Sequence, residues 1–351
     1  MPHGPPLKIL ILKPSSLGDV VQALPVLRLI KRQLPGSRIY WWIDTAISAL
    51  LEDDPDLAGL VLFDRQRWRA PRHWDELWRS VRGLRAQRFD WVIDLQSLAR
   101  SATMAWLANG GFTIGLEDGR EGAPVFYDQS VRRPAPSTHA VDWYLQVLPA
   151  LGIPVHRDFE WLPARPALAA RLREVWRPEG ARWIALQPGA RWLNKRWPAE
   201  YFVELIRRLN MPATDWRFAI LGGRDDAGLG AQISQADPRC CLDLTGKLSL
   251  PETVEWLRWS ELLVTNDTGP MHLAAALGKP VVALFGPTDP RRTGPYGQIE
   301  HALQLPLPCA PCLKDVCRHQ VPLECLRALS PAVVGERVRA RLVSLPAPVP
   351  R

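Results

Sequence analysis

Residues 7–20 read LKILILKPSSLGDV, an apolar run that leads through a turn of small residues into a helical pattern. A strand over residues 7–12 and a helix over residues 20–34 make the first βα unit of the chain. Short apolar runs alternate with amphipathic stretches through most of the sequence, which predicts parallel sheets covered by helices. In the first half we expect further strands at residues 38–43, 60–63, 91–95 and 112–116, and a helix at residues 74–87.

A second run of this alternation follows a proline-rich, aperiodic stretch at residues 158–166. A chain of 351 residues accommodates two domains. We therefore predict two doubly wound parallel-sheet domains, residues 1–162 and 163–330, facing across a cleft, with a terminal helix and tail at 331–351. In the second half the expected strands are residues 183–187, 217–221, 262–265 and 281–285, and the expected helices are residues 199–209, 250–259, 271–277 and 331–345, followed by a frayed end at 346–351.

The composition is that of a globular protein, with 47% hydrophobic and 23% charged residues. The sequence contains no run of 18 uncharged apolar residues, so we expect no membrane span. Its first residues lack the features of a signal peptide, and we therefore expect a cytoplasmic protein. The formal charge is +8, mostly from arginine and not collected in one tail. We expect this charge to favour phosphates, in a nucleotide, a phosphorylated lipid or an anionic membrane surface. Nucleic acid is not an expected partner, because no nucleic-acid-binding motif is present.

The first motif, residues 13–20, follows the first strand and reads KPSSLGDV. In doubly wound sheets ligands bind beyond the carboxyl ends of the strands, so this turn is a candidate site. Asp19 falls at the start of the next helix, where it could accept a proton from a sugar hydroxyl. The structural alternative remains open, since Ser and Asp are common residues at helix N-termini.

Two further motifs follow strands of the second half. Residues 187–191 read QPGAR and residues 194–198 read NKRWP, which places Lys195 among Arg191 and Arg196 on a loop before a helix. This loop is either an exposed basic loop or a clamp on a diphosphate whose negative charge grows as a sugar leaves. Residues 266–272 read NDTGPMH, in which Gly269 and Pro270 suit a helix N-terminus that binds an anion. His272, near the start of this helix, could equally be a packed core residue.

Several common sites are absent from the sequence. No G-x-x-x-x-G-K-[ST] loop, G-x-G-x-x-G fingerprint or G-x-S-x-G elbow occurs, and no D-x-D motif that would hold a metal. We therefore expect no cofactor and no catalytic metal, with Lys195 and helix N-termini supplying positive charge instead. Four cysteines crowd into residues 309–325, where they either bind structural zinc or are reduced and packed.

These motifs, in this order and separation, resemble glycosyltransferase family 9, the ADP-heptose:lipopolysaccharide heptosyltransferases. The similarity extends over residues 7–343. Its most specific parts are K-x-S-S-L-G-D at 13–19, K-x-W-P at 195–198, D-T-G-x-x-H at 267–272 and F-G-P-T-D-P at 285–290. The D-x-Q at Asp94 and Gln96 is also similar to the family, as is the cysteine-rich tail, which is similar to the second heptosyltransferase subgroup. Pro14 stands where Thr is common, and Gly189-Ala190 stand where some members carry hydroxyl residues.

The resemblance implies a GT-B fold, in which the N-terminal Rossmann-like domain takes the acceptor and the C-terminal one takes the nucleotide sugar. It implies an inverting, metal-independent transfer of heptose from ADP-heptose to lipid A-Kdo or to an already heptosylated lipopolysaccharide core, at the cytoplasmic face of the inner membrane. Asp19 is then the catalytic base. The implied donor-binding residues are Lys195, Asp267, Thr268, Gly269, His272, Gly189 and Arg191, and the acceptor-side candidates are Lys13, Ser15, Ser16, Gly18, Asp94 and Gln96.

Two alternatives to a transferase remain at this point. A sugar-nucleotide 2-epimerase would use the same donor site on the same fold but would need no acceptor. A non-catalytic protein would use the basic face only to dock on membranes.

Overall fold

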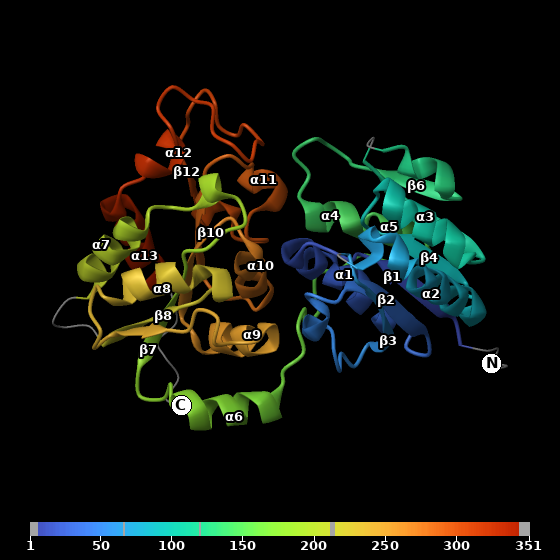
Figure 1. The fold of residues 1–351 in the computed structure, drawn as a ribbon, viewed down its shortest axis with the longest axis horizontal. Coiled ribbons are helices and arrows are strands. Elements are labelled where there is room, and N and C mark those ends of the chain that lie inside the picture. The colour runs from blue at the N-terminus through green and yellow to red at the C-terminus, as the bar shows by residue number, and fades with distance from the viewer. Residues whose placement is uncertain (1–5, 66, 119–120, 211–214, 344–351) are drawn as a thin grey trace. The chain divides into compact units, whose positions relative to one another are not determined.

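The chain folds into two compact α/β units, Met1–Pro163 and Ala164–Arg351 (Figure 1). The structure is a computed structural model that describes residues 6–65, 67–118, 121–210 and 215–343. The predicted frayed end at 346–351 and the last two residues of the predicted helix at 331–345 lie outside the described residues.

The first unit is built on a six-stranded sheet in which every strand pair is parallel. Its strand order is β3-β2-β1-β4-β5-β6, the order of a doubly wound dinucleotide-binding sheet. The central strand β1 is buried from Ile9 to Leu12, which explains its continuous apolar sequence. The strands are β1 (Lys8–Leu12), β2 (Arg38–Asp44), β3 (Leu57–Phe63), β4 (Trp91–Asp94), β5 (Phe112–Glu117) and β6 (Gln129–Arg132).

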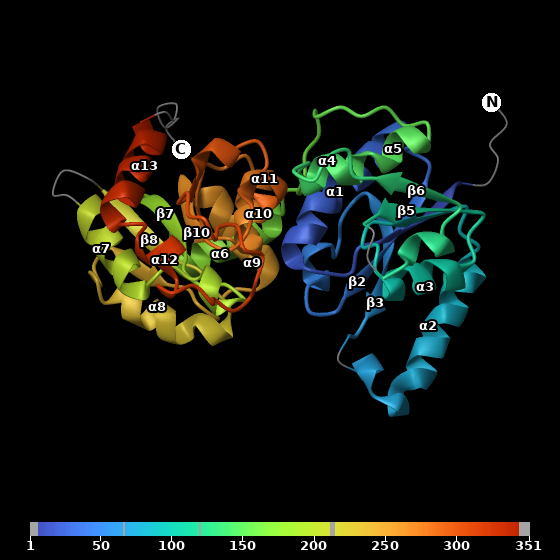
Figure 2. The same ribbon diagram turned by 90° about the horizontal axis from the view of Figure 1, so that it is seen from above.

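Helices cover both faces of this sheet. Figure 2 shows α2 and α3 on one face and α1, α4 and α5 on the other. The short helix η4 (Ala123–Phe126) packs beside α3. The helices of this unit are α1 (Leu17–Gln33), α2 (Trp74–Gln87), α3 (Ala99–Ala108), α4 (Ala140–Leu145) and α5 (Val147–Ala150).

The second unit repeats the same design. Its sheet is also wholly parallel, in the order β12-β11-β10-β7-β8-β9. Numbered within the unit and read from its other edge, this is the same order as in the first sheet. The strands are β7 (Arg182–Gln187), β8 (Trp216–Ile220), β9 (Cys241–Asp243), β10 (Leu262–Asn266), β11 (Val281–Phe285) and β12 (Ala302–Gln304).

The helices of the second unit also form two layers. One layer holds α7, α8 and α13, and the other holds α6, α9 and α10 (Figures 1 and 2). Trp197, Phe202 and Phe218 are large side chains in the core beneath α7. The helices are α6 (Pro166–Trp176), α7 (Ala199–Leu209), α8 (Ala227–Ser234), α9 (Leu250–Trp259), α10 (Gly269–Ala276), α11 (Pro290–Thr293), α12 (Glu324–Arg327) and α13 (Pro331–Val343).

The predicted fold class is confirmed by these two doubly wound parallel sheets. Every expected strand and helix coincides with an observed element, with described ends that differ by at most three residues. The edge strands β6, β9 and β12 were missed. They are only three or four residues long and half-buried or exposed, so they lack the apolar pattern of a central strand. The helices α3, α4, α5, α6, α8, α11 and α12 were also missed.

A buried arginine holds the end of the first unit. Arg28 of α1 donates two hydrogen bonds to Asp54, each of 2.6 Å, and one of 2.8 Å to Asp56. It also donates twice to the backbone carbonyl of Trp161, at 3.1 and 3.0 Å. Burial would lower the pKa of Arg28, but the two carboxylates reverse this and raise it. The chain is therefore fixed to the first unit up to this tryptophan, just before the boundary at Pro163.

None of the described helices combines the length and the apolar character needed to cross a bilayer.

Gly115 of β5 lies against the ring of Tyr127, where there is no room for a side chain. A Cβ at this position would lie 2.2 Å from a ring atom of Tyr127. We expect Gly115→Ala to lower the free energy of unfolding by about 1–3 kcal/mol, because a ring against a strand cannot move away freely. Gly83→Ala, in the interior of α2 with nothing within 4 Å of the added Cβ, should instead stabilise by about 0.5–1 kcal/mol. Urea unfolding of both variants measures this, and an unchanged Gly115→Ala protein would contradict the expectation.

Candidate functional site

The candidate residues lie at the point in each sheet where the strand order reverses. In the first sheet this point is between β1 and β4, and in the second it is between β7 and β10. The motifs at residues 13–19 and 94–96 follow the first pair of strands. The motifs at residues 187–198 and 266–272 follow the second pair. The topology therefore brings each pair of motifs together at one sheet edge, where ligands bind in this class of fold.

The turn after β1 fixes one oxygen of Asp19 within the helix end. Ser16 is the N-cap of α1, and its backbone nitrogen and Oγ donate to Asp19 Oδ2 at 3.0 and 2.6 Å. Tyr144 of α4 donates from its hydroxyl to Asp19 Oδ1 at 3.4 Å. Asp19 thus fills the capping role that the sequence left open, and its second oxygen faces Tyr144. Ser15 is half-buried, and Gly18 is buried in the first turn of α1.

Lys13 lies beneath this turn and is only 3% exposed. Its ammonium donates to the carbonyl oxygen of Leu95 at 2.9 Å and lies 4.6 Å from the centre of the Tyr144 ring. Burial would lower the pKa of Lys13, but Tyr144 and Asp19 reverse this and raise it. Lys13 therefore ties the end of β1 to the end of β4 and supports Tyr144 with a positive charge.

Asp94 shapes the neighbouring turn and is completely buried. Its Oδ1 accepts from the backbone nitrogens of Gln96 and Ser97, at 2.8 and 3.1 Å, and its Oδ2 accepts from the Tyr127 hydroxyl at 2.8 Å. Burial raises the pKa of this carboxyl, against the effect of its hydrogen-bond donors. Gln96, the other acceptor-side candidate in this turn, is half-buried as a residue. Its Oε1 atom is buried, and no described residue donates a hydrogen bond to it.

In the second unit Asn266, at the end of β10, joins two loops. Its side chain is fully buried. Its Nδ2 donates to the carbonyl oxygen of Pro188 at 2.7 Å, and its Oδ1 accepts from the backbone nitrogen of Trp197 at 3.0 Å. One amide therefore fixes both ends of the segment that carries Lys195.

Lys195 and Asp267 form an ion pair across these loops. The ammonium donates to Asp267 Oδ2 at 2.6 Å and lies 4.6 Å from the centre of the Trp192 ring. Thr288, which follows β11, donates to the same oxygen at 2.6 Å. Asp267 is 7% exposed, while the Lys195 side chain is 17% exposed. An ammonium has three donors, so this pairing still leaves Lys195 able to bind a second anion.

The glycine of the loop after β7 is required by close packing. A Cβ on Gly189 would lie 2.3 Å from Asp226 Oδ2. The loop is also held by Arg196, whose Nε donates to the carbonyl oxygen of Ala190 at 2.8 Å. Arg191 is exposed, and none of the described carboxylates pairs with it. Among the described residues it is therefore the exposed, unpaired cation of this loop, whereas Arg196 holds the loop backbone.

The helix α10 begins directly behind Asp267. Thr268 is its N-cap with an extended backbone, Gly269 is its first residue, and Pro270 lies in its first turn. The first peptide N–H groups of a helix lack helical partners and attract anions. His272, one turn in, is 9% exposed. The second unit therefore presents an ammonium and a helix N-terminus at the same edge of its sheet.

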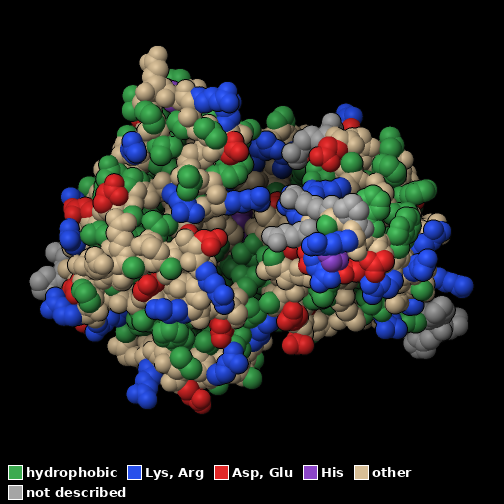
Figure 3. Space-filling view, in the orientation of Figure 1, with side chains coloured by type: hydrophobic (Ala, Val, Ile, Leu, Met, Phe, Trp, Pro, Cys, Tyr) green, Lys and Arg blue, Asp and Glu red, His purple; other side chains and the backbone are tan. Residues whose placement is uncertain are grey.

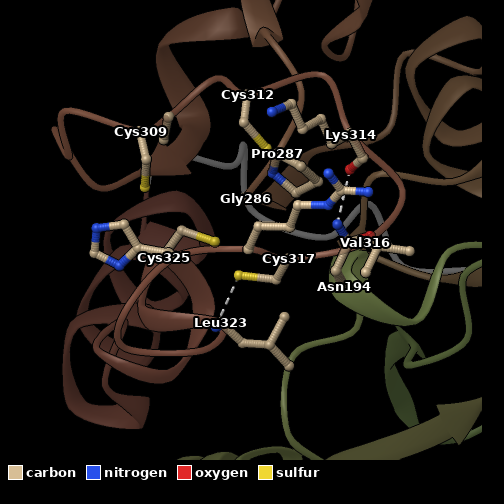
Figure 4. A pocket seen from close by; sticks show the side chains of 13 residues that line it. Asn194, Gly286, Pro287, Cys309, Cys312, Lys314, Val316, Cys317, Leu323 and Cys325 are labelled. Carbon is tan, nitrogen blue, oxygen red and sulfur yellow. Dashed lines mark hydrogen bonds between the residues drawn. The ribbon is translucent and has the colours of Figure 1, made fainter.

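The cysteine-rich segment packs beside this edge and lines a pocket of about 170 Å³ (Figure 4). Asn194 donates from Nδ2 to the carbonyl oxygen of Lys314 at 2.8 Å, and the backbone nitrogen of Leu313 donates to the carbonyl oxygen of Pro287 at 2.7 Å. Hydrogen bonds from the backbone of Leu323 and of His319 lower the pKa of the Cys317 thiol. Across the part of the chain that the structure describes, no group of three or more His, Cys, Asp or Glu side chains is placed to hold a metal ion. The pocket is lined by residues that include Cys309, Cys312, Cys317, His319 and Cys325.

The comparison with protein families decides the assignment. Residues 77–321, more than half of the chain, match the model of glycosyltransferase family 9 (heptosyltransferase). The chain belongs to glycosyltransferase family 9. It is therefore a heptosyltransferase by family, and the resemblance inferred from the motifs is confirmed.

Relatives of this heptosyltransferase are similar over almost their whole length. Lipopolysaccharide heptosyltransferase 1 of Pseudomonas aeruginosa is 30% identical, over 96% of this chain and 99% of that protein. Lipopolysaccharide heptosyltransferase 1 of Escherichia coli K12 is 26% identical, over 86% of this chain and 94% of that protein.

Solved structures share the fold of this family 9 chain. A glycosyl transferase family 9 protein from Veillonella parvula has a TM-score of 0.80 and 24% identity, over 97% of this chain and 98% of that one. The structure of E. coli heptosyltransferase WaaC with ADP has a TM-score of 0.74 and 24% identity, over 95% and 100%. These likenesses place the chain in the GT-B-like heptosyltransferase fold.

Several residues that organise the site of this heptosyltransferase are not identified by its sequence motifs. Tyr144 and Tyr127 come from parts of the chain without a motif, and only the fold brings them to Asp19 and Asp94. Thr288 lies within the motif at residues 285–290, but the sequence assigned it no binding role. Its position after a strand adjacent to β10 was the signal that could have identified it.

Replacing Asp94 should change how stability depends on pH. A carboxyl whose pKa is raised by folding binds its proton more tightly in the folded state, so stability falls as pH rises above its unfolded value of about 3.9. We expect the stability of the wild type relative to Asp94→Asn to decrease as pH rises from about 4, until the raised pKa is passed. The measurement is urea unfolding over this pH range.

The control for this experiment is Asp128→Asn. Asp128 is an exposed carboxylate that accepts from the backbone nitrogen of Thr113 at 2.7 Å. Because this carboxylate is exposed, Asp128→Asn removes a hydrogen-bonded carboxylate without the burial on which the effect expected for Asp94 depends. A wild-type stability that rises with pH relative to that of Asp94→Asn would contradict this expectation.

Proposed function

We propose that this heptosyltransferase transfers a heptose from ADP-heptose to the inner core of lipopolysaccharide, with Kdo or a core heptose as acceptor. The observation that carries the proposal is the near full-length similarity to lipopolysaccharide heptosyltransferase 1 of Pseudomonas aeruginosa. The family assignment favours transfer over the 2-epimerase and the non-catalytic protein that the sequence left open. We further propose that the enzyme works at the cytoplasmic face of the inner membrane, where such an acceptor lipid would be.

In this proposal the second unit binds the donor. Lys195 and the first N–H groups of α10, at Thr268 and Gly269, supply positive charge for the two phosphates. This charge stabilises the ADP that leaves as the glycosidic bond to the sugar breaks. Asp267 holds Lys195 in place through the 2.6 Å ion pair, and Thr288 orients that carboxylate. Arg191, which is exposed, adds a cation to the same loop. Gly189 and His272 complete the proposed donor site.

The first unit takes the acceptor in this proposal. Asp19 accepts the proton of the attacking hydroxyl as the new bond forms at the anomeric carbon. A direct displacement of this kind inverts the configuration of that carbon. The helix N-terminus favours the ionised form of Asp19, which makes it a weak base that acts late in the step. Ser15, Ser16, Gly18 and Gln96 shape the acceptor side, while buried Lys13 and Asp94 support these turns from behind.

The proposed reaction is tested by incubating the protein with ADP-heptose and a panel of truncated core acceptors. We expect one acceptor class to gain a single heptose, with release of ADP, as read by mass spectrometry. If no acceptor in the panel gains a heptose, the proposal is contradicted. Conversion of the donor without any acceptor would support an epimerase instead.

The role of Asp19 is tested by Asp19→Asn in the same assay. The amide can still accept the cap hydrogen bonds from Ser16, so the fold should be preserved, but it cannot accept the proton. We expect turnover to fall by about 100- to 10,000-fold while binding of ADP is unchanged. Turnover and ADP affinity are measured separately, by product formation and by calorimetry.

A matched capping residue in the second unit provides the control. Glu252 accepts from the backbone nitrogen and the Oγ of Ser249, each at 2.7 Å, at the start of α9. Glu252→Gln removes a capping carboxylate in the same way but should retain turnover. Equal losses in both variants would assign the effect of Asp19 to the helix cap rather than to catalysis.

A further inference from the structure

The positive charge of the chain is concentrated in one internal segment. Residues 64–88 contain eight arginines against three acidic residues, a net charge of +5 out of the +8 of the whole chain. The same segment holds three tryptophans. It includes the short helices η2 (Arg67–Arg69) and η3 (Pro71–His73) and all of α2. Neither the donor site nor the acceptor-side turns use it.

On α2 the aromatic and cationic side chains share one helix face. Trp74 and Trp78 are one turn apart and are 53% and 54% exposed. Arg82 follows one turn later, and Arg85 lies on the same side; both are exposed. Val81, next to this face, is buried and holds the helix to the sheet. The outer face of α2 therefore presents two large indoles beside two guanidinium groups.

These two arginines are not neutralised by neighbours, unlike others in the segment. Arg79 pairs with Asp75 at 2.8 Å, and Arg67 pairs with Glu76. Within the described ranges, neither Arg82 nor Arg85 forms an ion pair. Their charges remain available to an anionic partner.

The apolar part of this surface continues onto the next helix. Trp106 of α3 is 60% exposed, and Val125 of η4 is 83% exposed. The Trp106 ring lies 6.5 Å from that of Phe126, and α3 packs against both α2 and η4. Figure 3 shows hydrophobic side chains over α3, with Lys and Arg side chains and some acidic ones beside them near α2. Exposed apolar patches bordered by charges mark interaction surfaces.

We propose that this surface, the outer faces of α2, α3 and η4, docks onto a bilayer of anionic phospholipids. Tryptophan is favoured at membrane interfaces, where the ring enters the boundary and the indole N–H stays near the headgroups. Arginines next to such tryptophans bind lipid phosphates, and a cluster of basic residues close to a membrane surface is attracted to anionic lipid. A protein partner of ordinary composition would not require the excess positive charge. The inference rests on the membrane location proposed above, but not on the transfer chemistry.

The test is co-sedimentation of the full chain with vesicles. We expect binding to phosphatidylcholine vesicles that contain about 30 mol% phosphatidylglycerol, and little binding to phosphatidylcholine alone. Raising the salt from about 0.1 to about 0.5 M should weaken the binding, because exposed charges are screened. Arg82→Glu/Arg85→Glu should lower the partition coefficient by about tenfold or more. Trp74→Ala/Trp78→Ala should also lower it, with the salt dependence retained.

The matched control is Arg207→Glu/Arg327→Glu, which changes the net charge equally at exposed arginines of the second unit. It should bind vesicles more tightly than the α2 charge reversal. Thermal melting establishes that each variant is folded. Transfer to a water-soluble truncated acceptor should be unchanged in the α2 variants, which separates a failure of docking from a failure of the proposed reaction. Equal binding by the two charge reversals, or no binding of the wild type to anionic vesicles, would overturn the proposal.

Discussion

The site of this heptosyltransferase depends on the order of strands in two parallel sheets. In each sheet the first three strands are added from the centre towards one edge. The chain then returns to the centre, and the fourth to sixth strands are added towards the other edge. The loops that follow the first and fourth strands therefore diverge and leave space at the carboxyl end of the sheet. β1 and β4 create this space in the first unit, and β7 and β10 create it in the second. The quoted motifs all lie beside these strands or, for residues 285–290, beside the neighbouring β11.

Within that constraint, buried polar side chains determine where the loops lie. Asp94 and Asn266 occupy corresponding positions at the end of the fourth strand of each sheet, and both are fully buried. A buried polar group is stable only when it is hydrogen-bonded, so each holds specific backbone groups of an adjacent turn. Asp94 thereby fixes the turn of Gln96, and Asn266 fixes both ends of the segment of Lys195. The half-exposed groups that the proposed chemistry uses are supported by these buried ones.

The central elements could be predicted because burial on both faces imposes a pattern on the sequence. β10 and β11 are buried throughout, and both were expected nearly as observed. β9 and β12 were not expected, because an edge strand of three half-buried residues has no such pattern. α3 (Ala99–Ala108) was missed for a different reason: several of its buried residues are alanines and its tryptophan, Trp106, is exposed, so its apolar pattern does not mark the buried face.

The sequence by itself determined the two-domain parallel α/β class and the candidate residues within each motif. A strand, a turn and the first residues of a helix are adjacent in the chain, so their residue types identify them locally. The tertiary structure alone decided which side chains meet: Tyr144 at Asp19, Thr288 at Asp267, and the indoles of α2 beside exposed arginines. These residues are separated along the chain by up to 125 positions, or depend on which face of a helix is covered. Only packing of the sheets and helices brings such groups together, and no local pattern encodes it.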